Sequence, residues 1–213
     1  MTPSLLIQKY KRESGLILLG SIVLMRLAFS NSFPFVYPDT GTYIRSGFEL
    51  IPPIDRPIFY GLLIRLLSFS TTLWNVVLFQ SLMTAYLIYL IFRTFIYSKL
   101  FKFYYLFVLT ILSITTGISF NASMLTPDIF TPCLFLSIFI LGSVNEIHPG
   151  HKFTLSLIFI LSLLTHHSHV LIFVLSASIM YLLFHIYKYF RIQNYFKIIG
   201  LFVLSLVTTV LTN

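Results

Sequence analysis

Residues 73–92 read LWNVVLFQSLMTAYLIYLIF, a run of twenty positions without a charged side chain. A helix needs about 20 mostly apolar residues to cross the hydrocarbon core of a bilayer. The rest of the chain has the same character, since 57% of its 213 residues are hydrophobic and 9% are charged. Soluble domains carry about 25% charged residues. The composition therefore argues against a soluble domain and predicts an all-α protein with one transmembrane domain over residues 1–213.

Six more apolar segments accompany this one. Their lengths predict about seven spanning helices, near residues 15–33, 73–92, 103–120, 128–144, 153–165, 169–187 and 196–212. We expect a first outer loop over 34–72 with two short helices, near 40–50 and 56–70, which a Pro52-Pro53 break separates. Their mixture of apolar and charged residues is typical of interfacial helices. The sequence thus predicts a polytopic helical bundle with interfacial helices in its first outer loop.

Lysine and arginine in short loops predict the orientation, because cytoplasmic loops are enriched in them. With the N-terminus inside, ten lie on the inner side: Lys9, Lys11, Arg12, Arg93, Lys99, Lys102, Lys152, Lys188, Arg191 and Lys197. Three lie on the outer side: Arg45, Arg56 and Arg65. This bias predicts a multi-pass membrane protein with a cytoplasmic N-terminus. It also accounts for the net charge of +8, and without a basic run or RNA-binding motif we expect no nucleic-acid partner.

The same topology gathers polar side chains on the outer side. These are four of the six acidic residues and three of the six histidines: Asp39, Glu49, Asp55, Asp128, His166, His167 and His169. They are far apart in the sequence but could meet at one membrane level. The sequence therefore predicts a polar site on the non-cytoplasmic side.

Two aspartates in this set precede apolar or amphipathic helices, in Tyr37-Pro38-Asp39 and in Thr126-Pro127-Asp128. Asp39 could act as a general base or metal ligand, because a carboxylate can take a proton from an acceptor hydroxyl. Both aspartates could instead be N-caps, for which Asp is a favoured residue. An acidic residue at the edge of the hydrocarbon usually has a partner, so Asp128 is also a candidate for orienting a neighbouring loop.

Arg56 and the histidine cluster are candidates for binding phosphate. The planar fork of Arg56 suits a phosphate, although the residue could also pair with Asp55 or extend to lipid headgroups. Thr165-His166-His167-Ser168-His169 could bind a metal ion, contact a phosphate at a helix N-terminus, or form a polar turn. The residues alone leave these alternatives open, and a divalent metal ion stays open as a cofactor.

These motifs, in this order, resemble the GT-C superfamily of glycosyltransferases, in particular its protein O-mannosyltransferase and aminoarabinose-transferase-like group. The shared features are an acidic residue and a tyrosine in the first outer loop, a basic-Pro-apolar-aromatic motif, a Thr-x-Asp motif and a later polar turn. They correspond here to Asp39 with Tyr43, Arg56-Pro57-Ile58-Phe59-Tyr60, Thr126-Pro127-Asp128 and residues 165–169. The resemblance covers roughly residues 16–187.

The resemblance implies transfer of a sugar from a polyprenyl-phosphate donor to an acceptor on the non-cytoplasmic side, with Asp39 as the catalytic carboxylate. Donor contacts would come from Arg56, Tyr43, Asp128, His166, His167 and His169. It also implies a place in a bacterial inner membrane, with the active side facing the periplasm or exterior.

The chain departs from the family in three ways. Thr40 follows Asp39 where many relatives have Glu, and histidines replace the basic residue of the later turn. Relatives usually have more spanning helices, so we expect this chain to be an N-terminal fragment truncated at its C-terminus, a minimal homologue or an inactive relative. The alternative functions are a non-catalytic membrane subunit with a protein partner, and a lipid or solute transporter.

Overall fold

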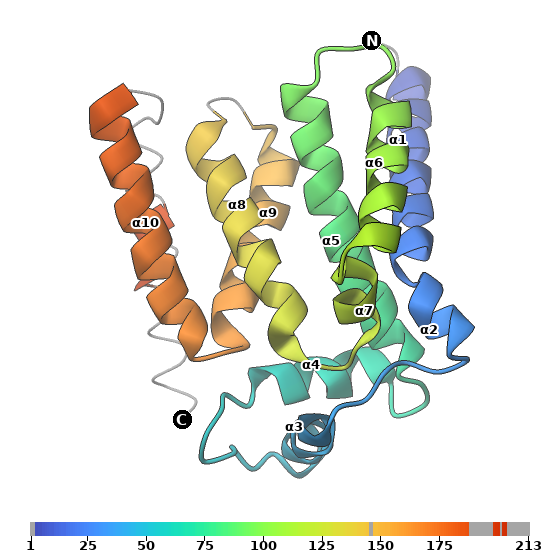
Figure 1. Ribbon diagram of the computed structural model, residues 1–213, viewed down its shortest axis with the longest axis vertical. Helices are drawn as coiled ribbons and strands as arrows, with labels where there is room; N and C mark the ends of the chain where they lie inside the picture. Colours follow the sequence, from blue (N-terminus) through green and yellow to red (C-terminus); the bar gives the residue numbers. More distant parts are fainter. Residues whose placement is uncertain (1–2, 145–146, 188–197, 201, 204–213) are drawn as a thin grey trace. The chain divides into compact units, whose positions relative to one another are not determined.

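The computed structural model describes residues 3–144, 147–187, 198–200 and 202–203, and this part of the chain is all-helical (Figure 1). Its named elements are α1 (Pro3–Leu24), α2 (Arg26–Ser30), α3 (Pro38–Glu49), α4 (Phe59–Ser68), α5 (Trp74–Phe95), α6 (Phe101–Thr115), α7 (Ile118–Ser123), η1 (Pro127–Ile129), α8 (Phe130–Ser143), α9 (Pro149–Leu164) and α10 (Ser168–Tyr187). Among these residues the β-type pairing is one isolated bridge between Phe35 and Met124. The predicted all-α class is confirmed.

Most predicted segments correspond to helices, but two are divided. The segment predicted at 15–33 consists of α1, a turn at Met25, and α2; the segment at 103–120 consists of α6 and the start of α7. The short helices predicted near 40–50 and 56–70 are α3 and α4. The helix predicted at 196–212 falls mostly outside the described residues.

Among the described helices, α5 alone is long and apolar enough to cross a membrane. The apolar helices α6, α8 and α9 have 15, 14 and 16 residues. At a rise of about 1.5 Å per residue, each is shorter than a hydrocarbon core of about 30 Å. Length and composition thus mark one candidate span, and the predicted number of seven stays a prediction.

The chain divides into two compact units, each made from two stretches of sequence. The first contains residues 1–36 and 71–125, and the second contains residues 37–70 and 126–213. Helices α1, α2, α5, α6 and α7 belong to the first unit, and α3, α4, η1, α8, α9 and α10 belong to the second.

Polar side chains in the first unit are paired between helices. Nη1 of Arg93 in α5 lies 2.9 Å from Oε2 of Glu13 in α1. Arg26, the charged residue within the first predicted span, donates from Nη2 to the backbone oxygen of Ser113 at 2.7 Å. The buried Gln80 donates from Nε2 to the backbone oxygen of Met124 at 3.0 Å. Because a covered polar group is costly without a partner, these bonds make the polar positions of the apolar helices tolerable.

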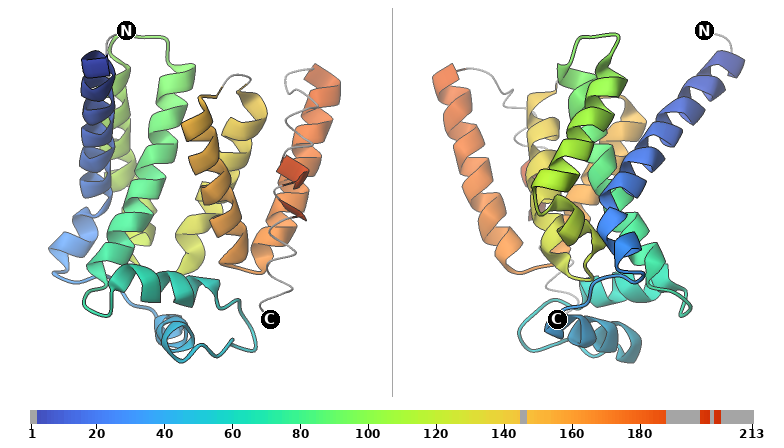
Figure 2. Two further views of the ribbon diagram at one scale, coloured as in Figure 1. Left: turned by 180° about the vertical axis from the view of Figure 1, so that it is seen from behind. Right: turned by 45° about the vertical axis from the view of Figure 1, so that its right-hand side comes forward.

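In the second unit α4 runs crosswise to α8, α9 and α10, near the end where α8 begins (Figure 2). α3 packs on α4, and the two backbones approach each other at Gly47 and Gly61. A Cβ atom on Gly47 would lie 2.0 Å from the backbone oxygen of Gly61. A Cβ atom on Gly61 would lie 2.4 Å from the backbone oxygen of Tyr43. Both neighbours are backbone atoms that cannot move aside by changing rotamer, so this crossing requires glycine.

Replacing Gly61 by alanine should therefore destabilise the second unit. Forcing extra atoms into a closely packed contact typically costs about 1–3 kcal/mol. We expect a lower midpoint of thermal unfolding for Gly61→Ala than for the wild type. Gly41→Ala is the matched control, because Gly41 lies in α3 with no atom within 4 Å of an added Cβ. Equal midpoints for Gly61→Ala and Gly41→Ala would contradict the close crossing.

Candidate active site

Asp39 lies in the first turn of α3 and is not its cap. Helix α3 has Tyr37 at its N-cap position, Pro38 in its first turn, and a hydrogen bond from the Tyr37 backbone N–H to Thr40 Oγ1 at 2.9 Å. The N-cap position belongs to Tyr37, whose N–H donates to Thr40 in the first turn, so the capping alternative is wrong for Asp39. The carboxylate stays in a place where the helix dipole favours negative charge, and its side chain is 47% exposed.

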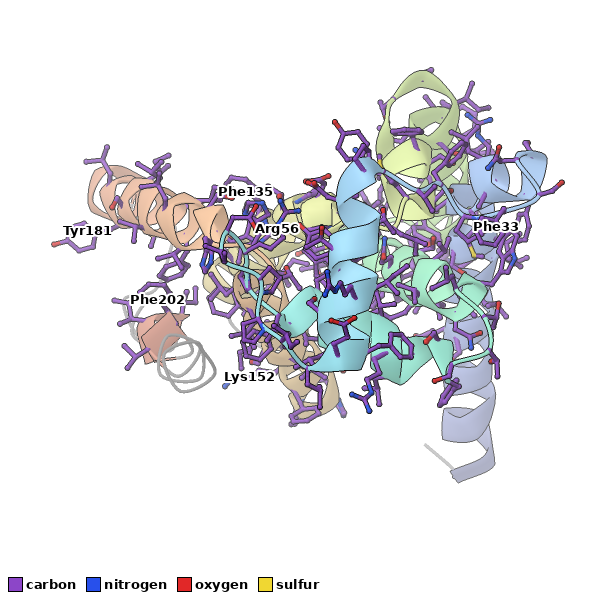
Figure 3. The ribbon with its side chains drawn as sticks, turned by 90° about the horizontal axis from the view of Figure 1, so that it is seen from below. Phe33, Arg56, Phe135, Lys152, Tyr181 and Phe202 are labelled. Atoms are coloured by element: carbon purple, nitrogen blue, oxygen red, sulfur yellow. The ribbon has the colours of Figure 1, made fainter. Side chains whose placement is uncertain are left out.

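Arg56 connects Asp39 to the loop before α4. Its Nη1 lies 2.9 Å from Oδ2 of Asp39, an ion pair without an aligned hydrogen bond from Nη1. Its other edge contacts Asp55, with Nε donating to Oδ1 at 3.0 Å and Nη2 donating to Oδ2 at 2.5 Å. Figure 3 labels Arg56 beside α3. The pairing with Asp55, one of the sequence alternatives for Arg56, is present, and the pairing with Asp39 accompanies it.

The Arg56 guanidinium packs on the face of an aromatic ring. The Arg56 guanidinium carbon lies 5.2 Å from the centre of the Tyr43 ring, a distance at which a cation is attracted to the ring face. The edge of the Tyr60 ring meets Tyr43 at a centroid distance of 5.0 Å, and Phe130 of α8 follows at 6.0 Å from Tyr60. This stack places Arg56 relative to both α3 and α8.

The charges of this cluster favour an ionised Asp55, an ionised Arg56 and a neutral Tyr43. The hydrogen bond from Arg56 holds the pKa of the Asp55 carboxyl below its ordinary value, and the same bond raises the pKa of Arg56. Burial raises the pKa of the Tyr43 hydroxyl, although Arg56 partly opposes this. Tyr43 is therefore a hydrogen-bond donor at neutral pH.

Asp128 and His167 lie near this cluster without touching Arg56. The Asp128 charge contributes to the raised pKa of Tyr43, and the His167 charge contributes to the lowered pKa of Asp55. Oδ2 of Asp128 accepts a hydrogen bond from Thr126 Oγ1 at 2.9 Å. Both Asp128 and His167 are exposed. Their exposed side chains lie near the cluster, where they could bind a ligand.

His169 differs from its neighbours because it is buried and fully bonded. Its Nδ1 contacts the backbone oxygen of Ser162, and its Nε2 lies 2.8 Å from Oγ1 of Thr131. A carbonyl oxygen only accepts, so Nδ1 carries the proton and Nε2 accepts from Thr131. His169 joins α10 to α8 and α9, and this leaves neither ring nitrogen for the donor contact predicted from the sequence.

His166 is partly exposed and belongs to the turn before α10. Its Nδ1 accepts from the Ser168 backbone N–H at 3.2 Å and lies 2.8 Å from Ser168 Oγ. The local bond indicates a capping role that still leaves Nε2 free to bind a ligand. Of the three histidines, His166 and His167 thus keep a free ring nitrogen in the described part of the structure.

The second unit therefore brings together Asp39, Tyr43, Arg56 and, at longer range, Asp128 and His167. Sequence reasoning named Tyr60 in a motif without foreseeing its contact with Tyr43, and it missed Thr131, since a hydroxyl beside apolar residues is common in any helix. Within the part of the chain that the structure describes, no cluster of three His, Cys, Asp or Glu side chains is placed to hold a metal ion. Comparisons of the chain with models of protein families, with curated proteins and with solved structures give no match.

Replacing His169 by alanine should destabilise the second unit, because Thr131 Oγ1 and the Ser162 carbonyl would lose their shared partner. An unsatisfied buried polar group typically costs about 1–3 kcal/mol. His167→Ala is the matched control, since it removes the same side chain from an exposed position two residues away. We expect the thermal midpoint to fall for His169→Ala alone. A similar fall for both variants would argue against the internal role of His169.

Proposed function

We propose that this protein is a membrane glycosyltransferase with Asp39 as its catalytic carboxylate. It transfers a sugar from a polyprenyl-phosphate donor to an acceptor on the non-cytoplasmic side of the membrane. The observation that carries this proposal is the half-exposed Asp39 carboxylate, whose Oδ2 lies 2.9 Å from Nη1 of Arg56. In this proposal the other oxygen, Oδ1, meets the acceptor hydroxyl.

The proposed step is a substitution at the anomeric carbon of the donor sugar. The acceptor oxygen forms a bond to that carbon, and the bond from the carbon to the phosphate oxygen breaks. The acceptor proton passes to Oδ1 of Asp39, and the bonding electron pair leaves with the polyprenyl phosphate. A carboxylate within hydrogen-bond reach of the hydroxyl can perform this proton transfer.

The other residues of the site have binding roles in this proposal. Arg56 orients Asp39 through their ion pair, and its positive charge stabilises negative charge that develops on the leaving phosphate. Tyr43 supports Arg56 from its ring face. Asp128 and His167 lie near the site, and His166 belongs to the same turn as His167. In this proposal the two histidines donate to phosphate oxygens and Asp128 accepts from sugar hydroxyls.

The membrane setting belongs to the same proposal. A bundle of about seven spans would carry α3 and α4 at its outer surface, in the plane of the bilayer interface. Supporting this, α4 runs crosswise to α8, α9 and α10 (Figure 2). The loop between α3 and α4 exposes Leu50, Ile51 and Ile54, apolar side chains that suit contact with lipid.

Replacing Asp39 by asparagine should abolish sugar transfer with little effect on folding. General-base catalysis contributes about 100-fold or more to a rate, so we expect at least that loss in membranes that express the variant. The assay measures transfer of radiolabelled sugar from a panel of polyprenyl-phosphate sugars, at matched protein levels.

Glu49→Gln is the matched control for Asp39→Asn. It removes a carboxylate charge from the same helix, at a position paired with Arg45 and away from Arg56. Full activity in Glu49→Gln beside none in Asp39→Asn supports the proposal. Equal activity in the wild type and Asp39→Asn would remove Asp39 from the chemistry, and a wild type that transfers no sugar from any donor would favour a non-catalytic subunit or a transporter.

The proposed topology predicts opposite labelling of two single-cysteine variants. Cys133 is buried and is the only cysteine, so it can be replaced by alanine to give a background without thiols. In intact cells a membrane-impermeant maleimide should label Arg45→Cys, and should label Lys152→Cys only after the membrane is permeabilised. Both positions are exposed. Labelling of both in intact cells would contradict the topology.

A further inference from the structure

The Nε and Nη2 edge of Arg56 is occupied by its own neighbour in the chain. Asp55 accepts one hydrogen bond from each of these nitrogens, at 3.0 and 2.5 Å. Two parallel N–H groups are the arrangement in which a guanidinium binds phosphate as well as carboxylate. Asp39 meets the remaining nitrogen, Nη1. The guanidinium can thus hold two anions at once, Asp39 on one side and a second anion on the bidentate edge.

Asp55 is held loosely compared with Arg56. The Asp55 side chain is 63% exposed, and in the described part of the chain it hydrogen-bonds to no side chain other than Arg56. It lies in a segment without regular secondary structure, so a change of rotamer would move it away. Exposed ion pairs are weak. Arg56 has only 18% of its side chain exposed and rests on Tyr43, so it would stay in place when Asp55 leaves.

The surroundings of Asp55 suit a phosphate attached to an apolar chain. His167 lies close enough for its charge to lower the pKa of the Asp55 carboxyl, and it could donate to an oxygen of a phosphate in that place. Just before Asp55, Ile51 and Ile54 are exposed. In a polyprenyl phosphate, the charged phosphate could bind Arg56 and the apolar chain could contact Ile51 and Ile54.

We propose that Asp55 occupies the position of the donor's phosphate on Arg56 and is displaced when that phosphate binds. This inference rests on the proposed function and names an autoinhibitory residue within it. The exchange replaces one anion by another, so Arg56 stays neutralised and its contact with Asp39 is kept. An empty site then holds Asp55 on Arg56, and donor binding must compete with it.

Removing Asp55 should strengthen phosphate binding. We would titrate farnesyl phosphate, a short polyprenyl phosphate, into the detergent-solubilised wild type and Asp55→Ala, and measure the dissociation constants by calorimetry. Loss of a weak exposed competitor should tighten binding by about two- to fivefold. An Asp55 that only positions Arg56 would give the opposite result, weaker binding in Asp55→Ala, and either that or an unchanged constant would overturn the proposal.

Glu49→Gln separates the specific effect from the general effect of one negative charge. Both variants raise the net charge of the same pair of helices by one unit, but Glu49 pairs with Arg45. The proposal requires tighter binding in Asp55→Ala alone, and equal tightening in both variants would overturn it. Arg56→Gln should lose binding of farnesyl phosphate both in the wild type and in Asp55→Ala. The midpoint of thermal unfolding of each variant checks that it is folded.

Two probes distinguish the sources of phosphate. Inorganic phosphate lacks the apolar chain, so tightening confined to farnesyl phosphate supports a lipid-linked ligand. Equal tightening for both supports the exchange at Arg56 and assigns recognition to the phosphate group alone. Because binding does not require sugar transfer, tighter binding in a protein without transferase activity would keep this site and reject the proposed function. If sugar transfer depends on Asp39 but Asp55→Ala does not bind farnesyl phosphate more tightly, only the proposed role of Asp55 is rejected.

Discussion

The candidate site depends on one guanidinium that is shared by two carboxylates. Arg56 is largely covered, and a covered charge needs partners to offset its lost hydration. Asp39 and Asp55 provide them on separate edges of the fork. This contact fixes α3 against the loop before α4, and the bond to Asp55 lowers the pKa of that carboxyl. The proposed chemistry and the proposed exchange at Asp55 both follow from this division of one side chain between two anions.

The helix crossing of α3 and α4 makes this division possible. Backbone contact at Gly47 and Gly61 brings the first turn of α3 close to the segment that carries Arg56. The stack of Tyr43, Tyr60 and Phe130 then connects the crossing to α8. Larger side chains at the two glycines would separate the helices, and the reach of Arg56 to Asp39 would be lost with them.

Much of the fold could be predicted from local sequence, and much of the site could not. Apolar length and proline positions predict helices, because these signals act within one segment. The ion pair of Arg56 with Asp55 could be predicted because the two residues are adjacent in the sequence. The ion pair of Arg56 with Asp39 depends on the crossing of α3 and α4, which the sequence does not reveal. Asp39 is a favoured capping residue, but α3 begins one residue before it, at Pro38, and Tyr37 holds the N-cap position. His169 looks like His166 and His167 in the sequence, and only packing against Thr131 and Ser162 distinguishes it. The number of membrane spans also stays a prediction, since most apolar helices are short for a bilayer.

The most direct test of this account is a cryo-electron microscopy structure of the protein in a lipid nanodisc with farnesyl phosphate bound. The account predicts the phosphate on Nε and Nη2 of Arg56, Asp55 turned away, and Asp39 still on Nη1 with its other oxygen open to the non-cytoplasmic side. A phosphate bound away from Arg56, or an Arg56 that has left Asp39, would contradict it.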